Sequence, residues 1–143
     1  MADHARRVSV HVEPRMVRFQ DVDAAGVVFY ARVFDYFHDA YVSFLRAAGA
    51  PLEDALRSGA WAAPLRHAEA DYRRPLRFGQ AVTVTLVAAD VRDSEYAIRY
   101  RIDADGDVAC EGSTVHVSVD PGTFRRRPIP DPLRAALQRL PSA

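Results

Sequence analysis

Two aspartates in one short segment have the clearest chemical potential of any side chains in this sequence. Asp21 and Asp23 lie in segment 20–26, whose Asp, Ala and Gly content is typical of a loop. A carboxylate can act as a general base that activates water, or as a nucleophile that forms a covalent intermediate. Taken by itself, an aspartate in such a loop more often forms a turn or caps a helix, so its role depends on what surrounds it.

A long helix is predicted directly after this loop. Apolar residues recur there at spacings of three and four, which places them on one helix face: Tyr30, Val33, Phe34, Phe37, Tyr41, Phe44, Leu45 and Ala48. A helix of about 19 residues is roughly 28 Å long, and so many aromatic residues on one face indicate that other elements wrap it. Backbone N–H groups at its N-terminus are unpaired and positively poled, so they can polarise a carbonyl and stabilise an oxyanion.

The remaining segments predict a sheet around this helix. Pro14 interrupts the first apolar segment, which predicts a strand over 15–19 with an edge extension over 8–12. A short helix is predicted at 51–57, strands at 62–72, 80–89, 95–102 and 108–119, and a short amphipathic helix within 128–140. Such a sheet must cover its apolar face, and only the long helix is large enough to do so. The predicted fold is therefore α+β, an antiparallel sheet wrapped around one long central helix.

Composition excludes several classes of protein. The 143 residues fit a single domain over 1–143, and a hydrophobic content of 49% can bury a core. Lys and Arg total 19, as do Asp and Glu, so the chain lacks the basic surplus of a nucleic-acid binder. The single cysteine, Cys110, rules out an intrachain disulfide and a Cys-rich zinc site. The polar N-terminus and the lack of an apolar run of about 18 residues predict a cytoplasmic protein without a membrane segment.

The segment RFQDVDAAGVVFY at 18–30 resembles the signature of the 4-hydroxybenzoyl-CoA thioesterase family. In that family an Asp-x-Asp turn leads through a small-residue loop into the long helix. The segments RPLRFG at 74–79 and EGSTVHV at 111–117 are similar to it too, and 64–72 looks more like 1,4-dihydroxy-2-naphthoyl-CoA thioesterases. The resemblance covers residues 17–137. It implies a hotdog fold, hydrolysis of acyl-CoA thioesters without metal or cofactor, and a homodimer or a dimer-of-dimers tetramer.

The resemblance implies roles for single residues of the loop. Asp23 falls on the position of the catalytic acidic residue, as base or nucleophile. The backbone amide of Tyr30 falls on the position that polarises the thioester carbonyl. Gly26 would let the loop approach the thioester closely, although a turn glycine is the simpler interpretation. Asp21 matches the first aspartate of the pair and is interpreted as structural, bonding loop amides.

Three further residues are candidates for substrate binding. The resemblance puts the strand that carries His67 beside the acyl pocket, where the imidazole can contact an aryl hydroxyl; a histidine bonded within the sheet is equally expected. Trp61 can shape an aromatic acyl pocket or fill the core. Arg92 falls near a position where the family uses arginine, and guanidinium groups suit the phosphates of CoA. Asp93 replaces the neighbouring arginine, so the arginine run 125–127 is an alternative basic patch.

The expected substrate is an aromatic hydroxyacyl-CoA of the 4-hydroxybenzoyl or 1,4-dihydroxy-2-naphthoyl type. His38 and Tyr41 stand where many relatives carry a glutamate and an arginine, so short or branched aliphatic acyl-CoA and acyl-carrier-protein thioesters remain alternatives. A non-catalytic acyl-CoA-binding hotdog protein would be expected to lose Asp23. A hotdog hydratase follows a different loop pattern, and a Ser-His-Asp hydrolase needs a Gly-x-Ser-x-Gly elbow that this sequence lacks.

Overall fold

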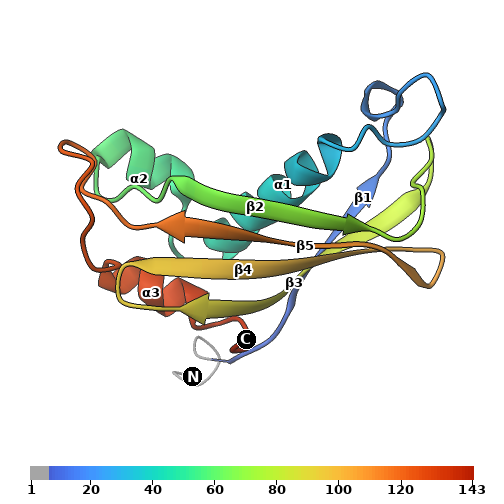
Figure 1. Ribbon diagram of the computed structural model, residues 1–143. Helices are drawn as coiled ribbons and strands as arrows, with labels where there is room; N and C mark the ends of the chain where they lie inside the picture. Colours follow the sequence, from blue (N-terminus) through green and yellow to red (C-terminus); the bar gives the residue numbers. More distant parts are fainter. Residues whose placement is uncertain (1–6) are drawn as a thin grey trace.

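Five strands form one antiparallel sheet in the computed structural model, which describes residues 7–143 (Figure 1). The strands are β1 (His11–Met16), β2 (Leu65–Tyr72), β3 (Ala81–Val91), β4 (Glu95–Ala104) and β5 (Asp107–Val117). Their order across the sheet is β1-β3-β4-β5-β2. Strands β3, β4 and β5 therefore form the predicted meander, and β1 and β2 are its two edges.

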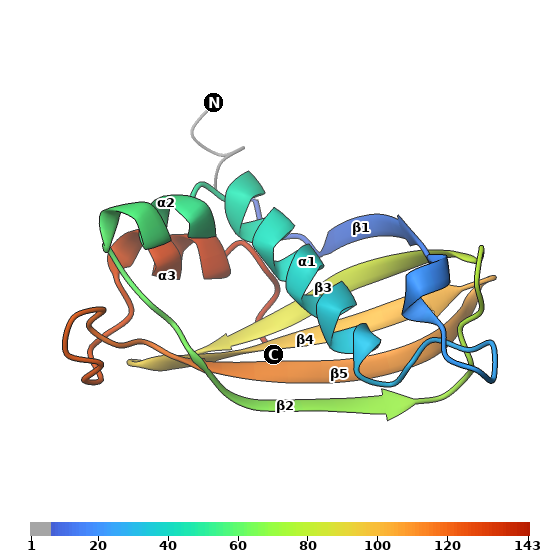
Figure 2. The same ribbon diagram turned by 90° about the horizontal axis from the view of Figure 1, so that it is seen from above.

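The helix α1 (Arg32–Ala47) packs along one face of this sheet (Figure 2). Its buried side chains form one stripe: Val33, Tyr36, Phe37, Ala40, Tyr41, Phe44 and Leu45. Alternate residues of the strands meet that stripe, among them Leu86, Ile98 and Ile102, which are fully buried. The short helices α2 (Leu52–Ser58) and α3 (Asp131–Leu137) lie at the end of the sheet opposite the loop that precedes α1. The predicted α+β arrangement of a sheet wrapped around one helix is confirmed.

Helix α1 packs directly on β5 at Gly112. A Cβ atom at this position would lie 2.6 Å from Cε2 of Phe37 and 2.5 Å from the carbonyl oxygen of Glu69. The Phe37 ring stacks on the ring of Tyr100 in β4, with 4.6 Å between the ring centroids. Glycine at 112 therefore lets the aromatic face of the helix sit directly on the strands.

The first strand is the one element that the sequence analysis placed wrongly. The structure shows a single strand, His11–Met16, that runs through Pro14, while Phe19 begins a 3-10 turn, η2 (Phe19–Asp21). Strand β1 is an edge and pairs only with β3. An edge strand tolerates proline, because the missing amide hydrogen is not needed for a second neighbour.

Within residues 7–143, no helix combines the length and the apolar character that crossing a membrane requires.

Candidate active site

The loop between η2 and α1 is held in shape by its own backbone. The amide of Asp23 donates to the carbonyl of Val27 at 3.0 Å, and the amide of Phe29 donates to the carbonyl of Asp21 at 2.8 Å. The amide of Gly26 donates to the carbonyl of Asp23 at 3.0 Å, and Gly26 has a φ of +79°. That φ lies in the left-handed region that glycine adopts without strain. Gly26 therefore serves the turn, and no atom lies within 4 Å of the place its Cβ would occupy.

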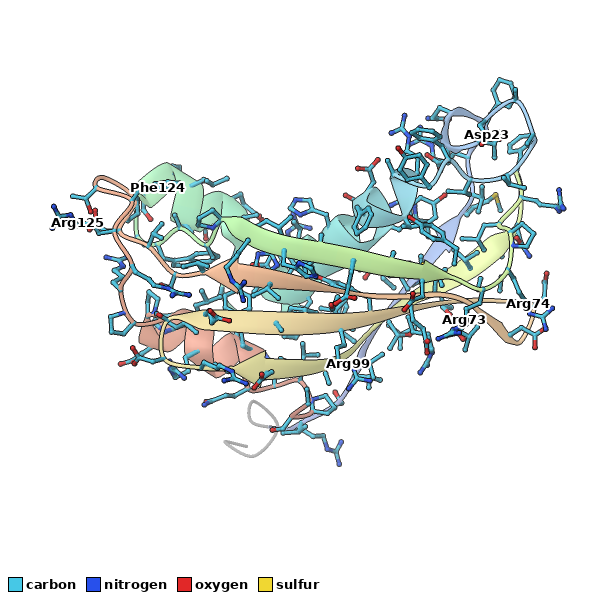
Figure 3. The ribbon with its side chains drawn as sticks, in the orientation of Figure 1. Asp23, Arg73, Arg74, Arg99, Phe124 and Arg125 are labelled. Atoms are coloured by element: carbon cyan, nitrogen blue, oxygen red, sulfur yellow. The ribbon has the colours of Figure 1, made fainter. Side chains whose placement is uncertain are left out.

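Asp23 lies at the exposed tip of this loop, above the N-terminal end of α1 (Figure 3). Its Oδ1 atom accepts a hydrogen bond from the amide of Ala25 at 2.8 Å, which fixes the carboxylate on the loop. No other group in residues 7–143 bonds to its second carboxylate oxygen. Asp23 thus keeps an oriented oxygen for a water molecule or a substrate.

The Tyr30 peptide lies two residues before Arg32, the first residue of α1, and directly before the N-cap Ala31. No acceptor in residues 7–143 bonds to the Tyr30 amide, which therefore lies unpaired beside the positive end of the helix dipole. The Tyr30 carbonyl accepts a hydrogen bond from the hydroxyl of Tyr72, the last residue of β2, at 2.7 Å. Tyr72 ties the start of the helix to the sheet. Sequence analysis missed it, because the two residues are 42 positions apart.

Asp21 has the opposite environment to Asp23. It is 4% exposed, and its Oδ2 atom accepts hydrogen bonds from the Tyr36 hydroxyl at 2.7 Å and from the Arg18 amide at 3.1 Å. Burial opposes ionisation, but these hydrogen bonds and the nearby Arg15 guanidinium outweigh it and lower the pKa of Asp21. Burial and the bond to Asp21 raise the pKa of Tyr36, so Tyr36 remains the donor. Asp21 bonds a loop amide as predicted, and it also clamps the loop to α1.

Two apolar pockets flank the start of α1. The first lies under the loop, has a volume of about 290 Å³, and is lined by Val27, Val28, Val33, Leu76, Ala109 and Cys110, with Arg73 and Arg74 among its polar groups. The second lies between α1 and β2, has a volume of about 230 Å³, and includes Phe34, His38, Leu65, Tyr100, Thr114 and His116. In the described residues, no three His, Cys, Asp or Glu side chains are grouped to hold a metal ion.

The three residues predicted to bind substrate do not meet Asp23 within one chain. His67 is half-exposed on β2 and lies 3.5 Å from the Glu69 carboxylate, on the strand face that points away from α1. Trp61 is 6% exposed and packs in the core. Arg92 lies in the turn between β3 and β4, where it bonds to Asp90 at 3.2 Å. That turn is at the opposite end of the sheet from Asp23, as is Arg125 (Figure 3).

Residues 17–137 match the thioesterase-like superfamily. A 1,4-dihydroxy-2-naphthoyl-CoA hydrolase from Rippkaea orientalis is 34% identical over 122 residues, which cover 83% of this chain and 88% of the relative. The hydrolase of that name from Gloeothece citriformis is 35% identical over 129 residues, covering 88% of this chain and 90% of the relative.

Solved structures agree with these sequence relatives. A 1,4-dihydroxy-2-naphthoyl-CoA thioesterase from Synechocystis superposes with a TM-score of 0.85 at 26% identity, over 90% of this chain and 96% of that chain. A gentisyl-coenzyme A thioesterase superposes with a TM-score of 0.78 at 25% identity, over 88% of this chain and 98% of that chain. Because the superfamily match takes in the Asp23 loop, α1 and all of the sheet except β1, this chain belongs to the thioesterase-like superfamily.

Proposed function

We propose that this protein hydrolyses an aromatic hydroxyacyl-CoA thioester of the 1,4-dihydroxy-2-naphthoyl or 4-hydroxybenzoyl type. One observation carries the proposal: an exposed carboxylate with a free, oriented oxygen, Asp23, lies on the loop that ends at the unpaired amide of Tyr30. The names of the relatives and of the solved neighbours support an aromatic acyl group.

The chemistry follows from these two groups. The thioester carbonyl oxygen accepts a hydrogen bond from the Tyr30 amide, which makes the carbonyl carbon more electrophilic and stabilises the negative charge of the tetrahedral intermediate. One such donor is worth about 2.7–4 kcal/mol of the barrier. Asp23 either takes a proton from the attacking water or attacks the carbon itself, giving an anhydride that water then hydrolyses. Both routes expel the CoA thiolate, which is protonated to the free thiol, and release the carboxylic acid.

We further propose a homodimer that forms through β2, which would account for the position of Arg92. Strand β2 is an edge of the sheet, and an unpaired edge is a template for a second strand. Two copies of β2 that pair antiparallel about a two-fold axis would place residue 65 of each copy near residue 72 of the other. The basic end of one subunit, which carries Arg92 and Arg125, would then lie close to the Asp23 loop of its partner. Arginines there would meet the phosphates of CoA.

The proposed substrate class is tested by steady-state hydrolysis of a panel of thioesters, with the released thiol detected by a chromogenic disulfide. The panel contains 1,4-dihydroxy-2-naphthoyl-, 4-hydroxybenzoyl-, benzoyl-, hexanoyl- and palmitoyl-CoA, and one acyl-carrier-protein thioester. The proposal predicts the highest kcat/KM for a hydroxylated aromatic thioester. A preference for hexanoyl-CoA would instead assign the acyl group to the apolar pocket under the loop, whose walls are valine, leucine and alanine side chains.

A further inference from the structure

A chain of hydrogen bonds runs along the wall of the pocket between α1 and β2. Nδ1 of His116 lies 3.3 Å from the carbonyl oxygen of Ala63, and Nε2 of His116 lies 3.0 Å from Oγ1 of Thr114. Oγ1 of Thr114 in turn lies 2.9 Å from the hydroxyl oxygen of Tyr100. All four residues line the pocket, so the chain belongs to its wall.

The direction of this chain follows from the chemistry of its members. The Ala63 carbonyl can only accept, so Nδ1 of His116 carries the hydrogen. Burial lowers the pKa of His116 to about 4, so the neutral ring leaves Nε2 as an acceptor. Thr114 gives its single hydroxyl hydrogen to Nε2, and Tyr100 must therefore donate to Thr114. Burial also raises the pKa of Tyr100, which keeps the hydrogen that it donates.

The surrounding packing holds the chain in this direction. The His116 ring lies between the rings of Tyr41 and Tyr96, with centroid distances of 4.8 and 5.0 Å and interplanar angles of 13° in both pairs. The hydroxyls of Tyr41 and Tyr96 bond to each other. The hydroxyl oxygen of Tyr100 has donated its only hydrogen, and its remaining capacity is that of an acceptor.

The pocket has the size and position to receive an aromatic acyl group. Its lining includes Phe34, which lies in the first turn of α1, four residues after Tyr30. A ring attached to a carbonyl at the Tyr30 amide therefore reaches it. A cavity of about 150 Å³ holds benzene, so the 230 Å³ of this pocket leaves room for a larger, substituted ring. The pocket under the loop, by contrast, has mostly aliphatic walls, and its charged side chains, Arg73 and Arg74, can only donate hydrogen bonds.

We propose that the pocket between α1 and β2 is the acyl subsite, and that Tyr100 selects substrates by accepting a hydrogen bond from a hydroxyl on the acyl ring. The inference rests on the proposed function and adds the residue that recognises the hydroxyl group of the acyl ring. Thr114 and His116 act as positioning residues, because they turn the lone pairs of Tyr100 toward the ligand instead of its hydrogen. The pocket therefore favours a ring that donates a hydrogen bond over a bare ring or a ring ether.

Three thioesters that differ in one ring substituent test this selection. They are 1,4-dihydroxy-2-naphthoyl-CoA, 1-hydroxy-2-naphthoyl-CoA, which lacks the second hydroxyl, and 1-hydroxy-4-methoxy-2-naphthoyl-CoA, in which that group can only accept. Wild type is expected to show a kcat/KM about tenfold higher for the dihydroxy ester than for the other two, since one net hydrogen bond is worth roughly that factor.

Matched variants identify the residue. Tyr100→Phe is expected to lower kcat/KM for the dihydroxy ester about tenfold and to leave the ester with one hydroxyl unchanged, so the second substrate reports correct folding. Tyr96→Phe removes a neighbouring buried tyrosine hydroxyl outside the chain and should leave the preference intact. Thr114→Val leaves the Tyr100 hydrogen without its acceptor, so the methoxy ester should improve relative to the dihydroxy ester.

The outcomes separate the two proposals. Hydrolysis of all three esters at equal kcat/KM by wild type, or an unchanged preference in Tyr100→Phe, would overturn the hydroxyl-reading role while leaving the thioesterase proposal in place. Inactivity of wild type on all three esters would overturn the proposed aromatic substrate, and the inference with it.

Discussion

At the scale of single residues, the two aspartates of the loop have opposite environments. Asp23 is exposed and bonds only to the Ala25 amide, so it is available to a substrate. Asp21 is buried and bonds to the Arg18 amide and the Tyr36 hydroxyl, so it anchors the loop to α1. An exposed carboxylate is solvated by water, so it needs few hydrogen bonds from the protein. A buried carboxylate has lost that water, and the protein must supply donors in its place.

Removing the Tyr36 hydroxyl tests this anchor. Tyr36→Phe keeps the ring under the Arg15 guanidinium, whose carbon lies 3.9 Å from the ring centroid, but leaves Asp21 short of one donor. We expect the free energy of unfolding to fall by about 1.5–3 kcal/mol, since the lost bond is to a charged group. Urea unfolding measures the change. Tyr30→Phe, which removes an exposed hydroxyl, should leave the midpoint unchanged; equal midpoints for all three proteins would show that the bond does not stabilise the fold.

The neutral state of His116 makes a second prediction at this scale. Because the pKa of His116 is about 4 in the folded protein and near 6.5 when unfolded, the unfolded chain binds the proton more readily between those values. Stability should therefore be full above pH 6.5 and fall by about 3 kcal/mol as the pH drops to 4. The groups facing His116 include Tyr41 and His38 from α1 and Tyr96 from β4, and the tyrosines stay neutral in this range.

The measurement is a series of urea unfolding curves from pH 7.5 to 4 for wild type and His116→Gln. Other carboxylates and histidines titrate in both proteins, so the difference between the two curves isolates His116. The difference should shrink steadily below pH 6.5. Parallel curves over the whole range would show that His116 is not held neutral by the fold.

At the scale of elements, α1 packs closely on β5 beside the wall of the second pocket. Gly112 allows the Phe37 ring to rest on the strand, and Phe37 then stacks on Tyr100 in the wall of the second pocket. The Tyr30 amide therefore lies near one end of the helix, and the pocket lined by Tyr100 lies along its side. A small displacement of α1 would move both together.

Gly112→Ala tests that packing. The added methyl group would lie within 2.6 Å of the Phe37 ring and the Glu69 carbonyl, so α1 or β2 must shift. We expect a loss of about 1–3 kcal/mol of stability, as for other overpacked cores, and a lower kcat with the loop displaced. Differential scanning calorimetry and the thioester assay measure the two effects. Ser113→Ala is the neighbouring control, and a Gly112→Ala protein with wild-type melting temperature would contradict the packing argument.

The sequence predicted these elements better than it predicted the contacts between them. The repeat of apolar residues from Val33 to Leu45 sufficed to predict α1, because the pattern of an amphipathic helix lies within one continuous segment of the sequence. The start of β1 was misplaced, because the tolerance of Pro14 depends on the strand being an edge. The motif of its own loop indicated Asp23 as the candidate carboxylate. Tyr72 and the chain from Ala63 to Tyr100 join distant segments, and no local pattern indicates them.

At the scale of the whole molecule, the residues proposed for catalysis and for CoA binding lie at opposite ends of the sheet of one chain. The Asp23 loop lies at one end, and the turn with Arg92 and the arginine run 125–127 lie at the other (Figure 3). Pairing of two β2 edges about a two-fold axis is the arrangement that brings these ends together. The unpaired edge of β2 and the separation between the Asp23 loop and Arg92 therefore both favour a dimer that pairs through β2.

A cysteine at the centre of β2 tests this assembly. Glu69 lies near the midpoint of the strand, so two copies of Glu69→Cys would lie beside the axis, close enough to each other for a disulfide. Under mild oxidation we expect a cross-linked species of twice 15.9 kDa on a non-reducing gel. Glu53→Cys on α2 is the control, and the native Cys110 is buried. A Glu69→Cys protein that stays monomeric by sedimentation would rule out pairing through β2.

The measurement that bears most directly on the central claim is the turnover of 1,4-dihydroxy-2-naphthoyl-CoA by wild type and Asp23→Asn. Asparagine keeps the size of the side chain and the bond to Ala25, but it neither takes a proton nor attacks a carbonyl. We predict a fall in kcat of about 10²–10⁴-fold with little change in KM, while Asp54→Asn, at an exposed aspartate of α2, keeps wild-type activity. Wild-type turnover by Asp23→Asn would contradict the claim that this carboxylate performs the hydrolysis.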